Sequence, residues 1–259
     1  MIQVVKIGGN VIDSPENLGR FLDDFARLPQ PAILVHGGGK EATRMCARLG
    51  IETKMIEGRR VTDAQTLDVV TMVYAGLINK RIVAMLQARG VNAIGLCGAD
   101  ANVIPSTRRS PIPQDYGYVG DIDAAKVNDQ ALKALLDAGM VPVICAITRS
   151  DEPANGLLLN SNADSVACAV ASAATRIAPV KMHYCFEKAG VLADVDNPDS
   201  LIETITPDKF VELKGAGVIH SGMIPKIQNA LGAVKAGVSS VIIKSSEALL
   251  SNRGTCVIL

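Results

Sequence analysis

Two glycine clusters, each directly after a short apolar run, constrain this chain more than any other feature of its N-terminal part. Residues 4–10 read VVKIGGN and residues 33–40 read ILVHGGGK. A strand that ends in glycines before a helix lets backbone N–H groups approach an anion without a Cβ in the way, and the helix dipole favours negative charge there. The two turns therefore predict a polyanionic ligand, or a transition state that builds up negative charge, held between them.

The composition argues against several classes of partner. The 26 Lys and Arg balance the 26 Asp and Glu, and aromatic residues make up 3% of the chain, with no Trp. We therefore expect no nucleic-acid partner, and no uninterrupted apolar stretch reaches the roughly 18 residues of a membrane span. The six cysteines form no C-x-x-C pair and the three histidines lack ligand spacing, so we expect neither disulfides nor a metal site. With no visible signal peptide, these features predict a cytoplasmic protein.

Apolar strands alternate with amphipathic helices along the whole chain. Strands after the first are predicted at residues 32–35, 93–96, 141–146, 180–185 and 241–243. Their Val and Ile content without polar alternation is typical of a parallel sheet covered on both faces. Helices are predicted at residues 15–28, 41–49, 63–88, 129–138, 163–174, 207–213 and 223–236. Two hairpins interrupt this α/β pattern, one turning at residues 57–58 and one spanning residues 103–122.

Three charged residues beside glycine-rich or helix-initiating segments are candidates for chemistry. Lys6 lies in an apolar strand two residues before Gly8, where it either meets a phosphate or extends to solvent from an edge strand. Lys226 lies in the first turn of a helix, where a cation is unfavourable unless an anion is present, although exposed helix lysines are common. Asp164 also lies in a first helical turn and is either a dipole partner or an organiser of the two lysines.

Segments spread over nearly the full length give these weak signals a common meaning. The chain resembles the amino acid kinase family, and within it the members that act on N-acetylglutamate. The segments that carry the resemblance are Lys6–Gly9, Val35–Gly39, Gly58–Thr62, Asn79–Lys80, Gly95–Asp100, Gly117–Gly120, Asn160–Asp164 and Gly222–Lys226, in the order of the family.

The resemblance implies a three-layer αβα sandwich around an open, mainly parallel sheet, with two lobes. Residues 1–175 would form an N-terminal lobe that binds the acylated amino acid and dimerises, and residues 176–259 a C-terminal lobe that binds ATP. The implied reaction is ATP-dependent phosphorylation of the side-chain carboxylate of N-acetyl-L-glutamate, in arginine biosynthesis. Mg²⁺ would bridge the ATP phosphates.

The resemblance also implies a role for each candidate residue. Lys6 and Lys226 would neutralise the transferring phosphoryl group, and Asp164 would hold both ammonium groups in place. Backbone N–H groups that stabilise the phosphoryl group would come from Gly8, Gly9 and Gly38, and the acylamino acid would be bound by Gly38, Gly39, Arg60 and Asn160. A carboxylate nucleophile needs no general base, so positioning and charge neutralisation suffice for this reaction.

Two departures from the family pattern keep alternatives open. Glu187 occupies a place where related kinases have an aspartate near the nucleotide, and the run at residues 145–150 lacks the glycine that usually follows this strand. N-succinylglutamate, or another N-acyl acidic amino acid, is therefore an alternative substrate. A regulatory protein that binds amino acids is the non-enzymatic alternative. A dinucleotide-binding enzyme is disfavoured, because Gly8-Gly9-Asn10 does not supply G-x-G-x-x-G.

Assembly is a further expectation from the resemblance. Arginine-inhibited members of the family carry an additional N-terminal helix that joins dimers into a hexamer, whereas Ile2 here already begins the first strand. We therefore expect a homodimer formed through the helix around residues 63–88, without inhibition by arginine.

Overall fold

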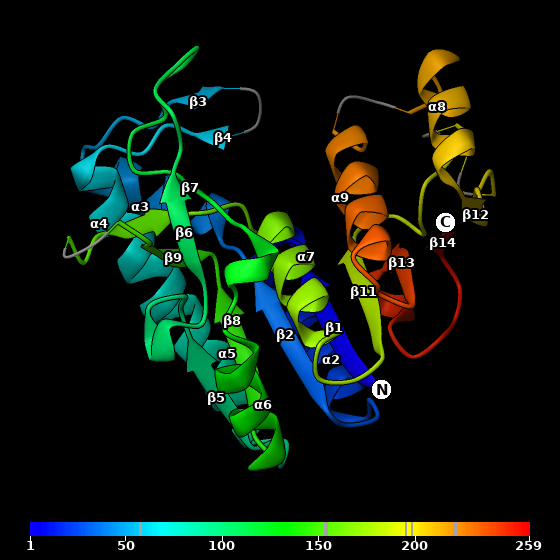
Figure 1. Cartoon of the computed structure of the whole chain (residues 1–259), viewed down its shortest axis with the longest axis horizontal. Coiled ribbons are helices and arrows are strands. Elements are labelled where there is room, and N and C mark those ends of the chain that lie inside the picture. Colours follow the sequence, from blue (N-terminus) through cyan, green and yellow to red (C-terminus); the bar gives the residue numbers. More distant parts are fainter. Residues whose placement is uncertain (57–58, 153–154, 195, 198, 220–221) are drawn as a thin grey trace.

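An eight-stranded sheet forms the centre of the computed structural model, which describes residues 1–56, 59–152, 155–194, 196–197, 199–219 and 222–259 (Figure 1). Its strand order is β12 (Thr204–Ile205), β14 (Thr255–Val257), β13 (Ser240–Ser245), β11 (Val180–Phe186), β1 (Ile2–Ile7), β2 (Ala32–His36), β8 (Val141–Cys145) and β5 (Ala93–Leu96). Each neighbouring pair is parallel except β13 with β14. The predicted open, mainly parallel sheet is confirmed.

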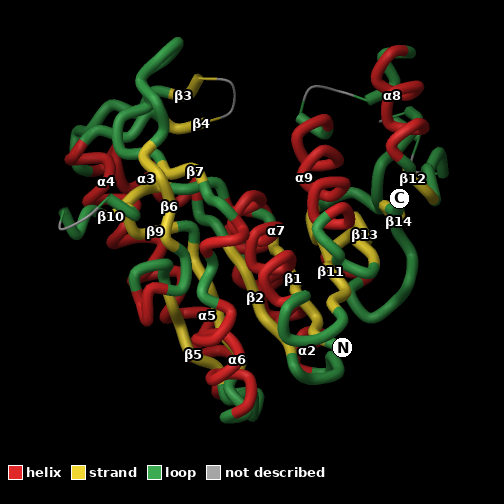
Figure 2. The backbone as a smooth tube through the Cα atoms, in the orientation of Figure 1, coloured by secondary structure: helices red, strands yellow, loops and turns green. Residues whose placement is uncertain are grey.

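Helices cover both faces of this sheet, which makes the three layers of the predicted αβα sandwich (Figures 1 and 2). One face carries α6 (Asp129–Asp137), α7 (Ala163–Ala174) and α9 (Ile224–Lys235), and the other carries α2 (Pro15–Ala26) and α5 (Asn79–Gln87). The remaining helices among the described residues are α1 (Gly9–Asp13), α3 (Gly39–Arg48), α4 (Ala64–Thr71), α8 (Pro207–Gly215), the π-helix η1 (Met72–Ile78), and the short 3₁₀ turns η2 (Asp100–Asn102), η3 (Ala124–Lys126) and η4 (Ser246–Ala248).

Local sequence explains why these elements form where they do. All six side chains of β1 are buried, as expected of a strand covered on both faces. Helix α2 begins where the Ser14 hydroxyl accepts a hydrogen bond from the Asn17 N–H at 3.2 Å, with Pro15 at the first helical position. Helix α2 buries four large apolar side chains, Leu18, Phe21, Leu22 and Phe25. The burial of each contributes about 2 kcal/mol to stability.

Two smaller sheets lie at the end of the main sheet where the parallel strands finish. Strands β3 (Met55–Ile56) and β4 (Arg59–Arg60) pair antiparallel, and the predicted turn between them, at residues 57–58, lies outside the described residues. The predicted hairpin within residues 103–122 is confirmed by antiparallel pairing of β6 (Pro105–Arg108) with β7 (Gly120–Asp121). Strands β9 (Ile147–Ser150) and β10 (Leu158–Asn160), which were not predicted, complete the order β10-β9-β6-β7.

Elements α4, η1 and α5 form one continuous helix over residues 64–87. Its mean hydropathy of 1.5 over the most apolar window makes it long and apolar enough, by length and composition, to cross a membrane. However, Val70, Ile78, Ile82 and Leu86 are fully or almost fully buried, and α5 packs against β5 and β8. This is therefore a core helix of the folded domain.

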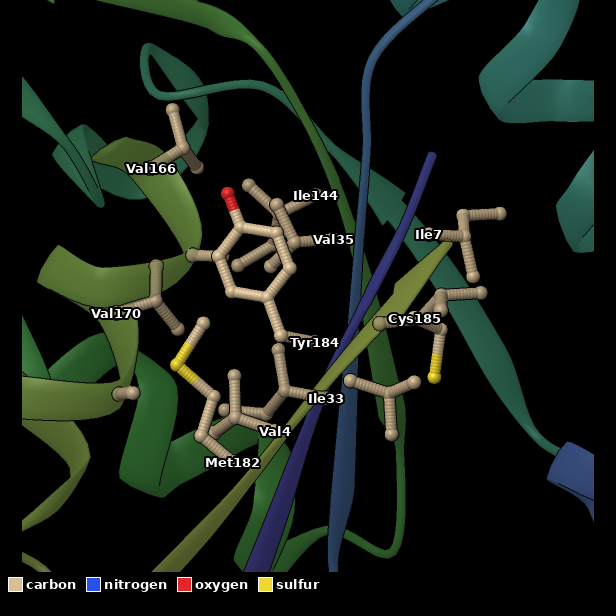
Figure 3. Close-up of a cluster of buried hydrophobic side chains, with 14 of the residues drawn as sticks. Val4, Ile7, Ile33, Val35, Ile144, Val166, Val170, Met182, Tyr184 and Cys185 are labelled. Carbon is tan, nitrogen blue, oxygen red and sulfur yellow. The ribbon is translucent and has the colours of Figure 1, made fainter. Parts of the chain in front are cut away.

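Helix α7 packs against β1, β2 and β11, and its sequence, ADSVACAVASAA, consists largely of small residues. Its Val166 and Val170 pack towards Val35 and Tyr184 (Figure 3). In the same view Tyr184 points to the α7 side of the sheet and Cys185 to the opposite side, as strand alternation requires. The N-terminus of α7 is thereby held over the ends of β1 and β11.

Candidate active site

Lys6, Asp164 and Lys226 form one ion cluster, although they come from β1, α7 and α9. Lys6 Nζ lies 2.6 Å from Asp164 Oδ1, and Lys226 Nζ lies 3.0 Å from Asp164 Oδ2. The side chains of Lys6, Asp164 and Lys226 are 8%, 16% and 25% exposed. Lys6 is therefore no edge-strand lysine that extends to solvent, and each carboxylate oxygen of Asp164 accepts one ammonium group.

Two opposing effects set the charge state of Asp164. Burial raises the pKa of its carboxyl, but the charges of Lys6 and Lys226 together lower it by more, and the resulting pKa is well below the usual value. Asp164 is therefore ionised at neutral pH. The cluster as a whole carries two ammonium charges and one carboxylate charge, and this excess positive charge suits an anionic ligand.

The cap of α7 fixes the backbone of Asp164. Asn162 Oδ1 accepts hydrogen bonds from the N–H of Asp164 at 2.8 Å and of Ser165 at 3.2 Å. Such a cap satisfies two N–H groups that would otherwise lack partners at a helix start. The carboxylate is thus placed by a rigid helix terminus and by two lysines, which leaves it little freedom to move.

A cavity of about 190 Å³ lies next to this helix terminus, and it brings together the four residues predicted to bind the acylamino acid. Its walls include Gly38, Gly39, Arg60 and Asn160, together with Gly37, Met55, Arg59, Tyr74, Val119, Ala146 and residues 161–163. Ala146 comes from the run at residues 145–150 that departs from the family pattern. Asn160 Nδ2 donates to Thr62 Oγ1 at 3.0 Å, which orients its amide group.

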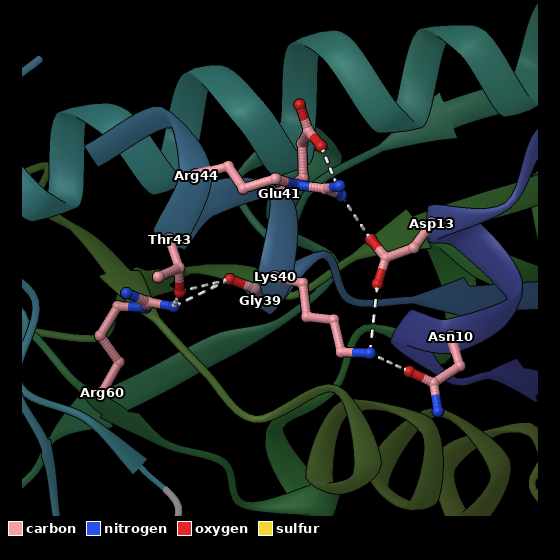
Figure 4. Close-up of polar contacts among 8 residues, drawn as sticks. All are labelled: Asn10, Asp13, Gly39, Lys40, Glu41, Thr43, Arg44 and Arg60. Atoms are coloured by element: carbon pink, nitrogen blue, oxygen red, sulfur yellow. Dashed lines mark hydrogen bonds and ion pairs between the residues drawn. The ribbon is translucent and has the colours of Figure 1, made fainter. Parts of the chain in front are cut away.

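Arg60 is the most informative side chain of the cavity (Figure 4). Its Nη2 donates to the Gly39 carbonyl at 2.9 Å and to Thr43 Oγ1 at 2.8 Å. Its Nη1 is buried and has no hydrogen-bond partner. The guanidinium also interacts with the Tyr74 hydroxyl. A buried guanidinium nitrogen without a hydrogen bond costs stability, so this position is suited to an anionic acceptor.

The second glycine turn is shaped by the π-helix η1. A Cβ at Gly38 would collide with Ile78 Cδ1 and come within 3.0 Å of the Tyr74 ring, so only glycine fits. Before this turn, His36 Nδ1 donates to the Gly37 carbonyl at 2.8 Å, and its Nε2 accepts from Asn79 at 3.1 Å. Burial lowers the pKa of His36 to about 4, against a smaller opposing effect of the Gly37 carbonyl, so His36 is a neutral structural residue.

The first glycine turn differs from expectation in one detail. The Gly8 N–H donates to the Cys185 carbonyl at 3.2 Å, whereas Gly9 begins α1. The predicted contact of the Gly8 N–H with a phosphoryl group stays a prediction, and it would require this bond to be shared or broken.

An ionic link joins the two glycine turns (Figure 4). Lys40 Nζ, at the start of α3, donates to Asn10 Oδ1 of α1 and lies 3.7 Å from Asp13 Oδ2. Arg44 Nη2 contacts Asp13 Oδ1 at 2.9 Å and Glu41 Oε2 at 2.7 Å. Helices α1 and α3, which follow the two glycine turns, are therefore tied together.

Comparison with known proteins decides the family. A sequence profile described as the amino acid kinase family matches residues 1–245. The chain belongs to the amino acid kinase family. Acetylglutamate kinase of Cytophaga hutchinsonii is 53% identical to this kinase over 251 residues, which cover 96% of this chain and 93% of the relative. Acetylglutamate kinase of Phocaeicola vulgatus is 48% identical, and the match covers 99% of this chain and 98% of that relative.

A solved structure shares the fold of this chain over nearly its full length. The crystal structure of smu.665 from Streptococcus mutans UA159 superposes with a TM-score of 0.79 at 29% identity, and it covers 99% of this amino acid kinase and 98% of that chain.

Some residues around the cluster of this amino acid kinase were not predicted. Tyr184 lies opposite Lys6 in the register of β11 with β1, and Tyr74 lines the cavity from η1. The position of Tyr184 in a buried strand was visible in the sequence, but its register against Lys6 was not. Among the described residues no group of three or more His, Cys, Asp or Glu side chains is placed to hold a metal ion.

Proposed function

We infer that this chain is an ATP-dependent kinase that phosphorylates the side-chain carboxylate of N-acetyl-L-glutamate, a reaction of arginine biosynthesis. Two relatives at 53% and 48% identity over nearly the full length bear the name acetylglutamate kinase. The observation that carries the inference is the pair of ammonium groups within 3.0 Å of Asp164, beside a cavity that contains an unpartnered arginine nitrogen. This arrangement suits a substrate with an α-carboxylate to anchor and a second carboxylate to phosphorylate.

The chemistry needs only positioning and charge. A side-chain carboxylate oxygen of the substrate attacks the γ-phosphorus of ATP, the bond from that phosphorus to the β–γ bridging oxygen breaks, and ADP leaves with the bonding electrons. The product is an acyl phosphate, and no proton has to be removed from the nucleophile. Lys6 and Lys226 stabilise negative charge on the transferring group, and Asp164 holds their ammonium groups where that charge develops.

We propose that the cavity binds the acylamino acid through the residues that line it. Arg60 Nη1 would donate to the α-carboxylate of the substrate, and Asn160 would add a contact from the opposite wall. The backbone N–H groups of Gly38 and Gly39, at the start of α3, would face the reacting carboxylate and the phosphoryl group. Support comes from the meeting of these four residues around one cavity.

Arg60→Ala is expected to raise the KM for the acylamino acid about a hundredfold, with a much smaller fall in kcat. The reason is the loss of a charge-assisted hydrogen bond to a ground-state carboxylate, worth about 1.5–3 kcal/mol. Steady-state kinetics with each substrate varied in turn measures this effect. Arg48→Ala, which removes an exposed arginine from the far end of α3, serves as the matched control. An unchanged KM in the Arg60 variant would contradict the assignment.

We propose that ATP binds to the lobe formed by residues 176–259, and the acylamino acid to residues 1–175. Every lining residue of the cavity falls in the first range. In the second range, a small apolar hollow lies between the loop after β11 and the start of α9, with room for part of an adenine ring. It is lined by Lys188, Gly190, Val191, Leu192, Val218, Ile219 and Met223. Glu187, which departs from the family pattern, is exposed beside it.

We propose that Mg²⁺ enters as its complex with ATP. The cluster offers two lysine ammonium groups, which repel a cation, and one carboxylate, whose two oxygens both contact those lysines. Such a set of groups binds phosphate oxygens better than it binds a metal ion without phosphates. When bound, Mg²⁺ neutralises charge on the β- and γ-phosphates, while Lys6 and Lys226 neutralise it on the transferring group.

Acyl-phosphate trapping with hydroxylamine tests the reaction and the substrate together. The purified protein would be incubated with ATP and Mg²⁺ and, in parallel, with acetylated, succinylated and free glutamate, and with acetylated aspartate and aminoadipate. We expect hydroxamate formation to be fastest with N-acetyl-L-glutamate. Faster turnover of N-succinyl-L-glutamate would select the alternative acyl group. Tight binding of an acylamino acid without any turnover would select the regulatory, non-enzymatic alternative.

We propose a cytoplasmic homodimer. All six cysteines are free thiols, which fits a reducing compartment. The core helix over residues 64–87 exposes Met72, Gly76, Leu77 and Ala84 on its outer side, with Met72 57% and Leu77 38% exposed. Lys80 and Arg81 are exposed on the same side of the helix, so this face is apolar at Met72 and Leu77 and charged one turn further on. Exposed apolar side chains at the centre of a long helix favour a self-complementary contact with a second copy.

Leu77→Lys is expected to convert the dimer to a monomer, because two buried lysines would face each other across a twofold contact. Light scattering should then report a mass near that of the 27.2 kDa chain instead of twice that value. Val211→Lys is the matched control, since Val211 is 68% exposed on α8 in the other lobe. A wild-type monomer, or a dimer that persists in the Leu77 variant, would contradict this interface. Titration of the kinase rate with arginine tests the expected lack of inhibition.

A further inference from the structure

Tyr184 occupies the sheet position beside Lys6. Strands β1 and β11 are parallel neighbours with Lys6 opposite Tyr184, so both side chains project from the same face, towards α7. The Tyr184 side chain is fully buried, and Figure 3 shows its hydroxyl directed towards the α7 side of the sheet. It therefore lies beneath the cluster formed by Lys6, Asp164 and Lys226.

The ring of Tyr184 contacts both cations of this cluster. Lys6 Nζ lies 5.1 Å and Lys226 Nζ 5.2 Å from the ring centroid. Both distances are within the range at which an ammonium group is attracted by the π-face of an aromatic ring, and the attraction is strongest where water is excluded. One ring thus supports two ammonium groups that must point at the same phosphoryl group, and no aliphatic side chain could provide this.

The hydroxyl of Tyr184 lies near the Asp164 carboxylate and interacts with it, but it makes no hydrogen bond of ordinary geometry to any described residue. A buried hydroxyl without a hydrogen bond of ordinary geometry destabilises the fold, and phenylalanine would fill the same space without that cost. Burial and the nearby Asp164 carboxylate raise the pKa of Tyr184 well above its usual value, so the hydroxyl keeps its proton and can act as a donor. Asp164 is the acceptor within reach, and both its oxygens are at present occupied by lysines.

We propose that Tyr184 is a positioning residue for phosphoryl transfer, whose ring holds the ammonium groups of Lys6 and Lys226 and whose hydroxyl donates to Asp164 when those lysines turn towards the phosphates. The inference rests on the proposed kinase function. Phosphate oxygens compete with Asp164 for the lysine N–H groups, and the buried carboxylate needs a replacement donor as those bonds lengthen. The hydroxyl would reach ordinary hydrogen-bond geometry with Asp164 in the substrate-bound enzyme.

Two substitutions separate the contributions of the hydroxyl and the ring. Tyr184→Phe is expected to lower kcat about tenfold, to leave both KM values within about twofold, and to leave the ligand-free protein at least as stable as wild type in urea unfolding. Tyr184→Leu also removes the ring and is expected to lower kcat about a hundredfold. Tyr116→Phe, which removes the hydroxyl of another buried tyrosine outside the cluster, is the control and should match wild type.

The outcomes are distinct. A Phe variant with wild-type kcat overturns the inference, because the hydroxyl would then serve no step of the reaction. A Phe variant that is less stable than wild type without substrates also overturns it, because the hydroxyl would then already make a full hydrogen bond to Asp164. If the wild-type protein itself forms no acyl phosphate, the proposed function fails. An active wild type with an equally active Phe variant leaves that function intact.

Discussion

Lys226→Ala and Lys6→Ala should each remain folded and turn over N-acetyl-L-glutamate about a hundred to a thousand times more slowly than wild type, with KM values changed only a few fold. Each ammonium group gains most of its interaction energy when negative charge builds up on the transferring phosphoryl group. Its removal therefore affects the transition state more than the bound substrates. Removal of a single oxyanion donor in a comparable setting costs about 3–4 kcal/mol of the activation barrier.

Lys235→Ala provides the matched control for Lys226→Ala, because it removes an exposed lysine from the last turn of the same helix. Single-turnover kinetics should locate the loss in the chemical step instead of product release. Urea unfolding of each variant verifies that the slow turnover does not reflect loss of folded protein. Wild-type kcat in either cluster variant would remove that lysine from the mechanism.

Much of the fold could be predicted from the sequence, because its signals are local. The strand at residues 93–96 and the helix at residues 163–174 have the predicted bounds, since apolar runs and caps mark both ends. Strands β9 and β10 were missed because they are short and include polar residues, and because β9 also pairs with β6, which is distant in sequence. The π-helical segment within residues 64–87 carries no recognisable signal, so this helix was predicted as uniformly α-helical.

The sequence identified those site residues that lie beside glycines or at helix starts, because both patterns are visible in the sequence itself. Lys6, Asp164 and Lys226 satisfied this condition and meet in one cluster, and Arg60 and Asn160 line one cavity. Tyr184 could not be identified in the same way. Its importance arises from the register of two strands far apart in the chain, and an aromatic residue in a buried strand otherwise indicates only packing. The free Arg60 nitrogen likewise appears only when the three-dimensional partners are known.

Asp164→Asn should abolish almost all activity and also destabilise the protein, a combination that neither lysine variant is expected to show. Its carboxylate is the acceptor for both ammonium groups of the cluster, at 2.6 and 3.0 Å. Without it, two largely buried cations repel each other and lack a counterion. Removal of one partner from a buried ion pair typically costs about 3–5 kcal/mol. Because the Lys226 side chain is 25% exposed, the lower end of this range is expected.

The pH dependence and a second substitution test this explanation. The pKa of Asp164 is lowered on folding, so its charge stabilises wild type above a pH of about 4, and this contribution is lost as the pH falls below that value. The stability difference between wild type and Asp164→Asn should therefore shrink in acid. Adding Lys6→Met to the Asp164→Asn variant removes one uncompensated cation and should restore part of the stability but none of the activity. A stability gap that stays constant with pH, or a double variant less stable than Asp164→Asn alone, would mean that Asp164 supports the fold through packing and not through its charge.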